Sequence, residues 1–238
     1  MNIDRGLDWD GCVNVRDLGG LSAANGRKTR RGAIVRSAKP DQLTPTGWAS
    51  LVAHGVRTIV DLREPSERTN LPPRPDGLTT VNVPLDDAPD TELWDHIREQ
   101  ELDGTCLYFP VFLERKPELC AQAVTAVAQA APGGVLIHCA AGWDRTGLIS
   151  LLLLALVGVS PEDIAADYLQ SGPNMAPVYL ELGYGDPLAT VADIHTRKGI
   201  TQHQSIAETV ATLDGDNYLR AAGVSEVDLM ALRQRMLD

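Results

Sequence analysis

Cysteines are few in this sequence and long apolar segments are missing, which excludes several kinds of protein. The 238 residues hold neither a Cys-x-x-Cys pair nor the cysteine and histidine spacing of a zinc finger; the four cysteines are Cys12, Cys106, Cys120 and Cys139. The longest apolar run, Leu151 to Val157, is far shorter than the ~20 residues that cross a bilayer. We therefore expect no disulfide framework, no zinc site and no membrane-spanning segment.

Basic residues are also scarce, because 21 lysines and arginines stand against 32 aspartates and glutamates, giving a formal net charge of −11. Such a surface repels the phosphate backbone of nucleic acids, so a nucleic acid is not an expected partner. The first residues, Met1 to Arg5, lack the basic start and apolar core of a signal peptide. These features favour a cytoplasmic protein, with secretion by a route that uses no N-terminal signal as the alternative.

Short strands and helices alternate along the first two thirds of the chain. Strands are expected at 13–15, 33–36, 57–62, 79–85 and 135–137, and helices at 45–54, 91–102, 117–131 and 148–157. The apolar strand 135–137, a glycine-containing turn and the apolar helix 148–157 are typical of a βα unit in a mostly parallel sheet. The predicted fold class is α/β, with a central, mostly parallel sheet flanked by helices and with additional C-terminal helices.

Beyond Ser160 we predict only helices and loops, including helices at 205–213 and 225–237. The stretch 173–202 contains glycines and prolines without clear periodicity, which predicts either a mobile lid or a composite loop over the core. No long linker separates two halves of the chain. We therefore expect a single domain over 1–238, in which 173–238 is a candidate helical lid or extension.

The segment from His138 to Gly147 has the residues that a phosphate-binding loop requires, between a buried strand and the start of a helix. The N–H groups of a tight loop converge on one point, and the positive end of the helix dipole adds to the field there. Arg145 can donate two parallel hydrogen bonds to phosphoryl oxygens. The expected substrate-binding residues are His138, Ala140, Ala141, Gly142, Trp143, Asp144 and Arg145.

Cys139 stands at the start of this loop, where the same N–H groups favour a thiolate over a thiol. A thiolate can attack phosphorus, form a phosphocysteine and release the alcohol, after which water frees inorganic phosphate. We expect the Thr146 hydroxyl to hydrogen-bond the sulfur, and His138 to organise the loop rather than to act as a base. This mechanism needs neither a metal nor a cofactor.

The pattern His-Cys-x-x-Gly-x-x-Arg-Thr-Gly at 138–147 resembles the Cys-x5-Arg signature of cysteine-dependent tyrosine, dual-specificity and phosphoinositide phosphatases. Other segments resemble the bacterial tyrosine/serine phosphatases typified by mycobacterial tyrosine phosphatase B, namely Asn14 to Gly20, Arg36-Ser37, Val60 to Arg63 with Glu67, and Tyr218-Leu219 to Leu232-Arg233. The resemblance covers almost the whole chain. It implies a phosphatase α/β fold whose extra helices can cover the active site, and phosphotyrosine as the first substrate, with phosphoserine and phosphothreonine open.

Trp143 departs from that bacterial subgroup, which often has lysine at this position. A lysine would attract further phosphates on an inositol ring, and Trp143 removes that charge. The stretch 142–146 nevertheless resembles the myotubularins, which act on singly phosphorylated phosphoinositides, whereas Trp143 can equally stack on a phosphotyrosine ring. A phosphoinositide substrate therefore stays open beside a phosphorylated protein.

The leaving oxygen needs a proton, for which the sequence offers Asp144 in the loop and Asp86 and Asp87 after the strand 79–85. Resemblance to the bacterial subgroup favours Asp86 or Asp87, and resemblance to the myotubularins favours Asp144. All three are candidates for the general acid.

Two other classes of function compete with hydrolysis. Rhodanese-type sulfur transfer also uses a cysteine in an anion-binding loop, but Arg145 argues against it. A phospho-residue binding module without turnover would keep the loop, which the presence of both Cys139 and Arg145 disfavours.

Polar residues outside the loop are expected to be mainly structural. Asn14, Arg16 and Asp17 lie beside glycines and are expected to tie a turn together. Asp61, Arg63 and Glu67 either form a salt-bridge network at the carboxyl end of a strand, or Arg63 faces the substrate, because ligands gather at the carboxyl ends of parallel strands.

Overall fold

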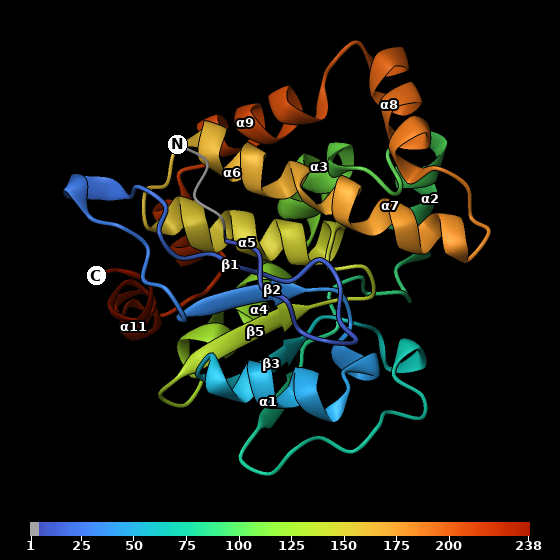
Figure 1. The fold of residues 1–238 in the computed structure, drawn as a ribbon. Helices are drawn as coiled ribbons and strands as arrows, with labels where there is room; N and C mark the ends of the chain where they lie inside the picture. Colours follow the sequence, from blue (N-terminus) through green and yellow to red (C-terminus); the bar gives the residue numbers. More distant parts are fainter. Residues whose placement is uncertain (1–4) are drawn as a thin grey trace.

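The computed structural model describes residues 5–238, which contain a five-stranded sheet in the order β1-β2-β5-β3-β4 (Figure 1). The strands are β1 (Arg16–Asp17), β2 (Ile34–Ser37), β3 (Val56–Asp61), β4 (Thr79–Asn82) and β5 (Gly134–His138). Strands β2 to β5 are mutually parallel, and β1 runs antiparallel to β2 at one edge. The predicted α/β class with a mostly parallel sheet is confirmed.

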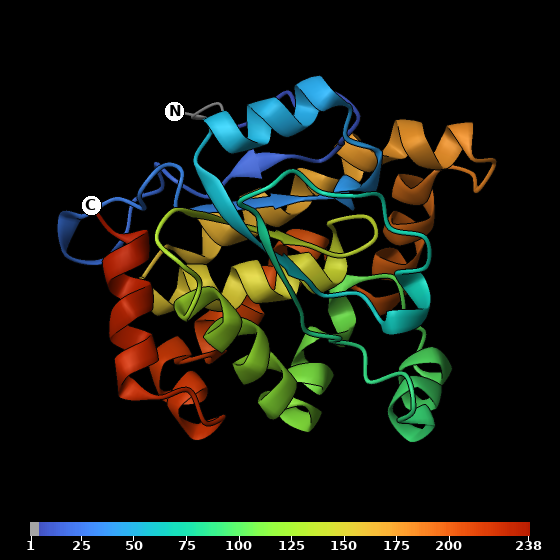
Figure 2. The ribbon, with the colours of Figure 1, turned by 90° about the horizontal axis from the view of Figure 1, so that it is seen from below.

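Helices lie on both faces of the sheet. The α-helices are α1 (Pro45–Ala53), α2 (Thr91–Glu99), α3 (Phe109–Arg115), α4 (Pro117–Ala128), α5 (Asp144–Leu156), α6 (Pro161–Leu169), α7 (Ser171–Glu181), α8 (Pro187–Lys198), α9 (Gln202–Thr212), α10 (Gly215–Ala221) and α11 (Glu226–Met236). Helix α1 covers one face, α5 lies on the other, and α6 to α9 form an outer layer beyond α5 (Figure 1). Figure 2, seen from below, shows α11 in red beside α4 in yellow-green.

Side chains along β5 alternate between two buried clusters, as the pleat of a strand requires. Val135 and Ile137 belong to the large cluster with α4 and α5, whereas Leu136 belongs to the smaller cluster with α1. Because both faces are covered, the strand is apolar throughout. This burial fixes the position of the chain at His138, immediately before the phosphate loop.

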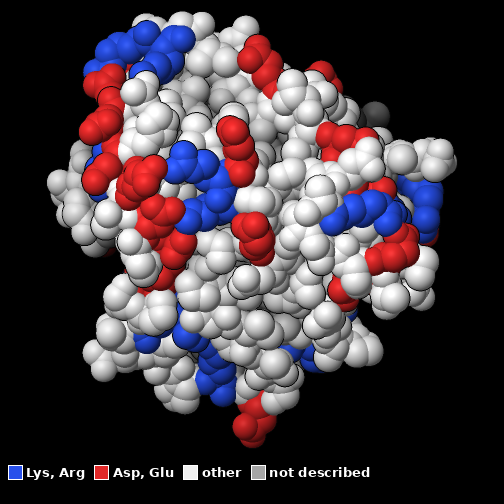
Figure 3. All heavy atoms as spheres, turned by 180° about the vertical axis from the view of Figure 1, so that it is seen from behind, with Lys and Arg blue, Asp and Glu red and all other residues white. Residues whose placement is uncertain are grey.

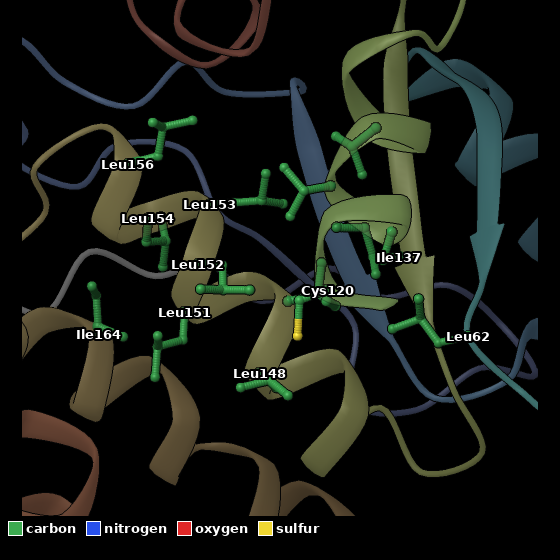
Figure 4. Close-up of a cluster of buried hydrophobic side chains, with 14 of the residues drawn as sticks. Leu62, Cys120, Ile137, Leu148, Leu151, Leu152, Leu153, Leu154, Leu156 and Ile164 are labelled. Carbon is green, nitrogen blue, oxygen red and sulfur yellow. The ribbon is translucent and has the colours of Figure 1, made fainter. Parts of the chain in front are cut away.

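Helix α5 is apolar on every side because other elements enclose it. The sheet and α4 contact it from one direction, and α6 and α10 from others. Figure 4 shows Leu152 and Leu153 near Cys120 and Ile137, with Leu151 directed toward Ile164 of α6. Such a helix is typical of the centre of a layered domain. No helix within residues 5–238 has the length and apolar character needed to cross a membrane.

Charged side chains on the surface are largely interleaved. Figure 3, which shows the molecule from behind, has basic groups bordered by acidic ones across this face. Arg98 pairs with Asp95 and Arg115 with Glu92, for example. Such pairing limits the positive potential on this face, as expected for a chain with a net charge of −11.

Several predicted boundaries were wrong by a few residues. The strand expected at 13–15 is β1 at Arg16–Asp17, and β4 ends at Asn82 rather than at 85. Helix α5 begins at Asp144 rather than at 148, so that Arg145 and Thr146 lie in its first turn. Helices α3 and α10 were not predicted.

The stretch 173–202 is mostly helical rather than irregular, which corrects the prediction of a composite loop. Helix α7 continues through Pro177, a residue that normally interrupts helices and hid the pattern. Helix α8 begins at Pro187, with the Asp186 carboxylate accepting from the N–H of Leu188. Helices α9, α10 and α11 pack on α6, α5 and α4, so α7 and α8 are the part of 173–238 that extends outward.

Candidate active site

The loop from Cys139 to Trp143 connects the end of β5 to the start of α5. The first N–H groups of a helix have no acceptor within it, and the helix dipole favours an anion at that end. Gly142 turns the loop with a φ of 65°, and a Cβ atom there would lie 2.1 Å from the Ser37 carbonyl oxygen. Only glycine therefore fits this turn. Cys139 is 3% exposed at the base of the loop.

Residues just before β1, within β2 and just after β2 hold the carbonyl groups of the loop. Asn14 Nδ2 donates to the carbonyl oxygens of Ala141 at 3.0 Å and Gly142 at 3.1 Å. Arg36 Nη2 donates to the Gly142 oxygen at 2.9 Å, and the Ala140 oxygen accepts from the N–H of Lys39 at 2.9 Å. Because these donors bind the carbonyl groups of the loop, its N–H groups stay available to bind an anion.

A buried cluster of charges lies directly behind the loop. Asp167 of α6 accepts hydrogen bonds from Arg5 at 2.7 Å, Arg16 at 3.1 Å and Arg36 at 2.7 Å. Burial opposes the charge of Asp167, yet the three arginines hold the pKa of its carboxyl well below the usual range. Burial also lowers the pKa of Arg16, to about 9. Three cations against one anion leave positive charge behind the loop, which favours an anion within it.

Arg145 is held by two carboxylates that come from different loops. Its Nη1 and Nη2 atoms donate to Glu67 Oε2 at 2.6 Å and Oε1 at 2.9 Å, and Nη1 lies 2.9 Å from Asp86 Oδ2. Burial opposes the charge, but the hydrogen bonds that Arg145 donates to Glu67 and the charges of Cys139 and Asp86 raise the pKa of Arg145 overall. The guanidinium is thus held by two carboxylates and stays charged.

Of the two neighbouring aspartates, the structure brings Asp86 and not Asp87 to Arg145. Burial raises the pKa of Asp86 to about 6 although Arg145 opposes this, and the Asp86 backbone oxygen accepts from Trp94 Nε1 at 2.7 Å. Asp87 has a positive φ of 49° and its carboxylate binds Lys116 Nζ at 2.7 Å. A carboxyl group that is partly protonated near neutral pH is suited to donate a proton.

Asp144, the candidate acid within the loop, has a different environment. Its Oδ1 atom accepts from the Tyr168 hydroxyl at 2.6 Å, and burial raises the pKa of its carboxyl. The neighbouring Trp143 is 5% exposed, with its indole ring against Gly172 of α7. Asp144 is therefore engaged with α6, and Trp143 with α7.

His138 and Thr146 are both fully buried. His138 Nδ1 lies 3.0 Å from the Cys139 carbonyl oxygen, and burial lowers the pKa of His138 to about 4, so the neutral ring donates to the loop rather than acting as a charged group. The Thr146 hydroxyl has no hydrogen-bond partner among residues 5–238. The hydrogen bond that we expected from Thr146 to the Cys139 sulfur is thus not formed here.

Arg63 and the other cysteines are away from the chemistry. Arg63 Nε donates to Asp61 at 2.9 Å and its Nη1 to Asp41 at 2.6 Å. Of the two alternatives for Arg63, the structure therefore has the salt-bridge network. The remaining cysteines are free thiols, and burial raises their pKa values to about 11 for Cys12 and about 12 for Cys106 and Cys120.

Sequence reasoning missed the residues that support this loop from a distance. Glu67 was expected in a salt-bridge network with Asp61 and Arg63 rather than with Arg145, Arg36 was noted only for its resemblance, and Asp167 and Tyr168 were not singled out. A buried acid and a tyrosine in α6 give no local pattern. Only the three-dimensional arrangement pairs them with the loop.

A buried cysteine at the end of a parallel strand, a glycine turn and an arginine at a helix start together define a cysteine-dependent phosphatase site. Comparison of sequences agrees, because the family described as the tyrosine phosphatase family matches residues 7–238. The chain belongs to this family.

Several relatives align along most of the chain. A protein of Cupriavidus necator named as a putative tyrosine-protein phosphatase is 30% identical, over 97% of this chain and 88% of its own length. The triple specificity protein phosphatase PtpB of Mycobacterium tuberculosis is 25% identical, over 95% of this chain and 97% of its own. Among solved structures, P. aeruginosa TpbA aligns with a TM-score of 0.40 and 18% identity, over 82% of this chain and 89% of TpbA.

Proposed function

We propose that this tyrosine phosphatase hydrolyses phosphotyrosine in protein substrates, with Cys139 as nucleophile, Arg145 as phosphate ligand and Asp86 as general acid. The observation that carries the proposal is the contact of Asp86 with Arg145 at 2.9 Å. This contact joins the proton donor to the group that would bind the transferring phosphate.

In the first step the Cys139 sulfur bonds to phosphorus while the bond from phosphorus to the tyrosine oxygen breaks. Arg145 exchanges its contact with Asp86 for two phosphoryl oxygens, and Glu67 keeps the guanidinium oriented. Asp86, once released from Arg145 and protonated, gives its proton to the leaving oxygen. The products of this step are the free tyrosine side chain and a phosphocysteine.

In the second step water attacks phosphorus, passes its proton to the Asp86 carboxylate, and the bond from sulfur to phosphorus breaks. The buried Thr146 hydroxyl, a donor without a partner among the described residues, can then hydrogen-bond the departing thiolate. Inorganic phosphate leaves and Asp86 is protonated again. The loop residues from His138 to Asp144 bind the phosphate throughout, and the chain from 1 to 238 acts as one phosphatase domain.

Phosphotyrosine is the proposed substrate because Trp143 stands where a lysine would be needed to attract an inositol phosphate. The name of the mycobacterial relative, a triple specificity phosphatase, supports testing other phosphate esters as well. Phosphate release should be measured side by side from a phosphotyrosine peptide, a phosphoserine peptide and phosphatidylinositol 3-phosphate, with chelator and reductant present. We expect the phosphotyrosine peptide to be turned over fastest.

Cys139→Ser provides the decisive variant. It should abolish turnover while the phosphotyrosine peptide still binds, because serine is a far weaker nucleophile in the same loop. Cys12→Ser is the matched control, since the free Cys12 thiol contacts the backbone oxygens of residues 13, 38 and 39 rather than the phosphate loop, and the variant should leave turnover unchanged. Substantial turnover by Cys139→Ser would exclude the phosphocysteine mechanism.

A further inference from the structure

A cavity of about 250 Å³ opens beside the phosphate loop, and we call it the indole pocket. Trp143 and Asp144 line it from the loop, and Tyr179 of α7, Val191 and Ile194 of α8 and Tyr184 between these helices line it from outside. Its volume is below the roughly 300–1,000 Å³ of pockets for drug-sized ligands, so it suits a single side chain.

Trp143 marks the pocket as a binding site rather than a packing defect. Its side chain is 5% exposed, and its indole Nε1 atom is buried without a hydrogen-bond partner among residues 5–238. A buried donor without an acceptor is unfavourable, so native proteins rarely keep one without a functional reason.

The walls of the pocket select against a second phosphate. No lysine or arginine of the described chain lines it, whereas Asp103 and Asp144 do. An inositol phosphate or a second phosphorylated residue would meet these carboxylates without a counter-charge. The ligand must therefore carry no negative charge where it enters.

The rim of the pocket is apolar and open. On the turn between α7 and α8, Tyr184 of the pocket wall is 74% exposed, and it is one of the six large apolar side chains exposed in the described chain. The rings of Tyr179 and Tyr184 stand 6.0 Å apart at 70° to each other. Apolar groups gathered next to a catalytic loop are typical of substrate recognition.

We propose that the indole pocket binds an apolar side chain next to the phosphotyrosine in a peptide substrate. The proposal rests on the proposed function and adds its substrate preference. An extended peptide places the neighbouring side chain beside the phosphate loop, where the pocket lies.

The test compares phosphotyrosine peptides that differ only in the residue on either side of the phosphotyrosine, as leucine, glycine or aspartate. Burial of a leucine side chain should raise kcat/KM at least about tenfold over glycine at one of the two positions. p-Nitrophenyl phosphate, which has no neighbouring residue, measures the proposed function separately. If it is not hydrolysed, the proposed function fails, whereas hydrolysis without a leucine preference overturns only the pocket.

Two exposed positions on the α7–α8 turn give a matched pair of variants. Tyr184→Ala removes a wall of the pocket and should reduce the leucine to glycine ratio to near one. Leu182→Ala changes a neighbouring exposed residue that does not line the pocket, and it should keep the ratio. Ile194→Asp, which places a charge in the pocket, should also abolish the preference. A ratio that survives both Tyr184→Ala and Ile194→Asp, or a preference for aspartate, would overturn the proposal.

Discussion

Replacing Asp86 by asparagine tests the assignment of the general acid. The variant keeps the size of the side chain and removes the proton that the leaving phenoxide requires. General acid catalysis is worth roughly 10²–10⁴-fold, which corresponds to about 3–5 kcal/mol of transition-state stabilisation. We therefore expect kcat for a phosphotyrosine peptide to fall at least about 100-fold. The loss should be smaller for p-nitrophenyl phosphate, whose leaving group needs a proton less.

The pH dependence gives a second readout of the same variant. The Asp86 carboxyl has a pKa of about 6 and must be protonated to act as the acid. As the pH rises through this value the protonated fraction decreases, so kcat/KM of the wild type should fall about tenfold per pH unit above about pH 6. Asp86→Asn has no such group to titrate, so this limb of its profile should be flat.

The same substitution should strengthen the binding of anions. Arg145 loses a carboxylate at 2.9 Å that competes with phosphate for its N–H groups. Two unit charges a few ångströms apart interact by up to about 4 kcal/mol near a protein surface, and part of that is returned to the incoming phosphate. The inhibition constant of inorganic phosphate should thus fall several-fold.

Two neighbours serve as controls. Asp87→Asn alters the adjacent residue, whose carboxylate binds Lys116, and kcat should stay within about twofold, as for a surface ion pair. Asp144→Asn alters the candidate acid in the loop. If Asp144→Asn removes the basic limb of the profile while Asp86→Asn leaves it, the assignment of Asp86 is wrong.

Three further substitutions test the support of the loop. Asp167→Asn leaves Arg5, Arg16 and Arg36 without their carboxylate, so urea unfolding should show a loss of about 3–5 kcal/mol, and a loss below 1 kcal/mol would contradict the role of the cluster. Gly142→Ala places a Cβ atom 2.1 Å from the Ser37 oxygen, so phosphate binding and kcat should both fall at least about tenfold; full activity would refute the turn requirement. Glu67→Gln keeps one acceptor oxygen for Arg145 but loses the second acceptor and the charge, so KM should rise about fivefold with the pH profile unchanged in shape, and an unchanged KM would show that Glu67 does not orient Arg145.

The catalytic loop could be predicted from the sequence because its signals are local. An apolar strand, a cysteine, a glycine and an arginine follow each other within a dozen residues, and each has a direct physical meaning. The choice of the general acid among three aspartates could not be made from local signals. It depends on the burial of Asp86 against Arg145 and on the hydrogen bond from Trp94 Nε1 to the Asp86 backbone oxygen, and these residues come from separate parts of the chain.

The helical cover was harder to predict for a different reason. Pro177 within α7 contradicts local helix propensity, and packing of α7 beside α8 overrides it. The charge cluster behind the loop was also invisible, since Arg16, Arg36 and Asp167 lie in elements far apart in the sequence.

That distance has a consequence for how the protein matures. Asp167 lies 131 residues beyond Arg36 and 162 beyond Arg5, so the counter-ion for these arginines is made long after them during synthesis. Contacts of such long range are slow to form, and a ribosome-bound chain that ends before α6 would expose three unpaired cations. The gain of phosphatase activity on a growing chain should therefore wait until α6 has emerged, which makes turnover a sensitive reporter of the last stage of folding.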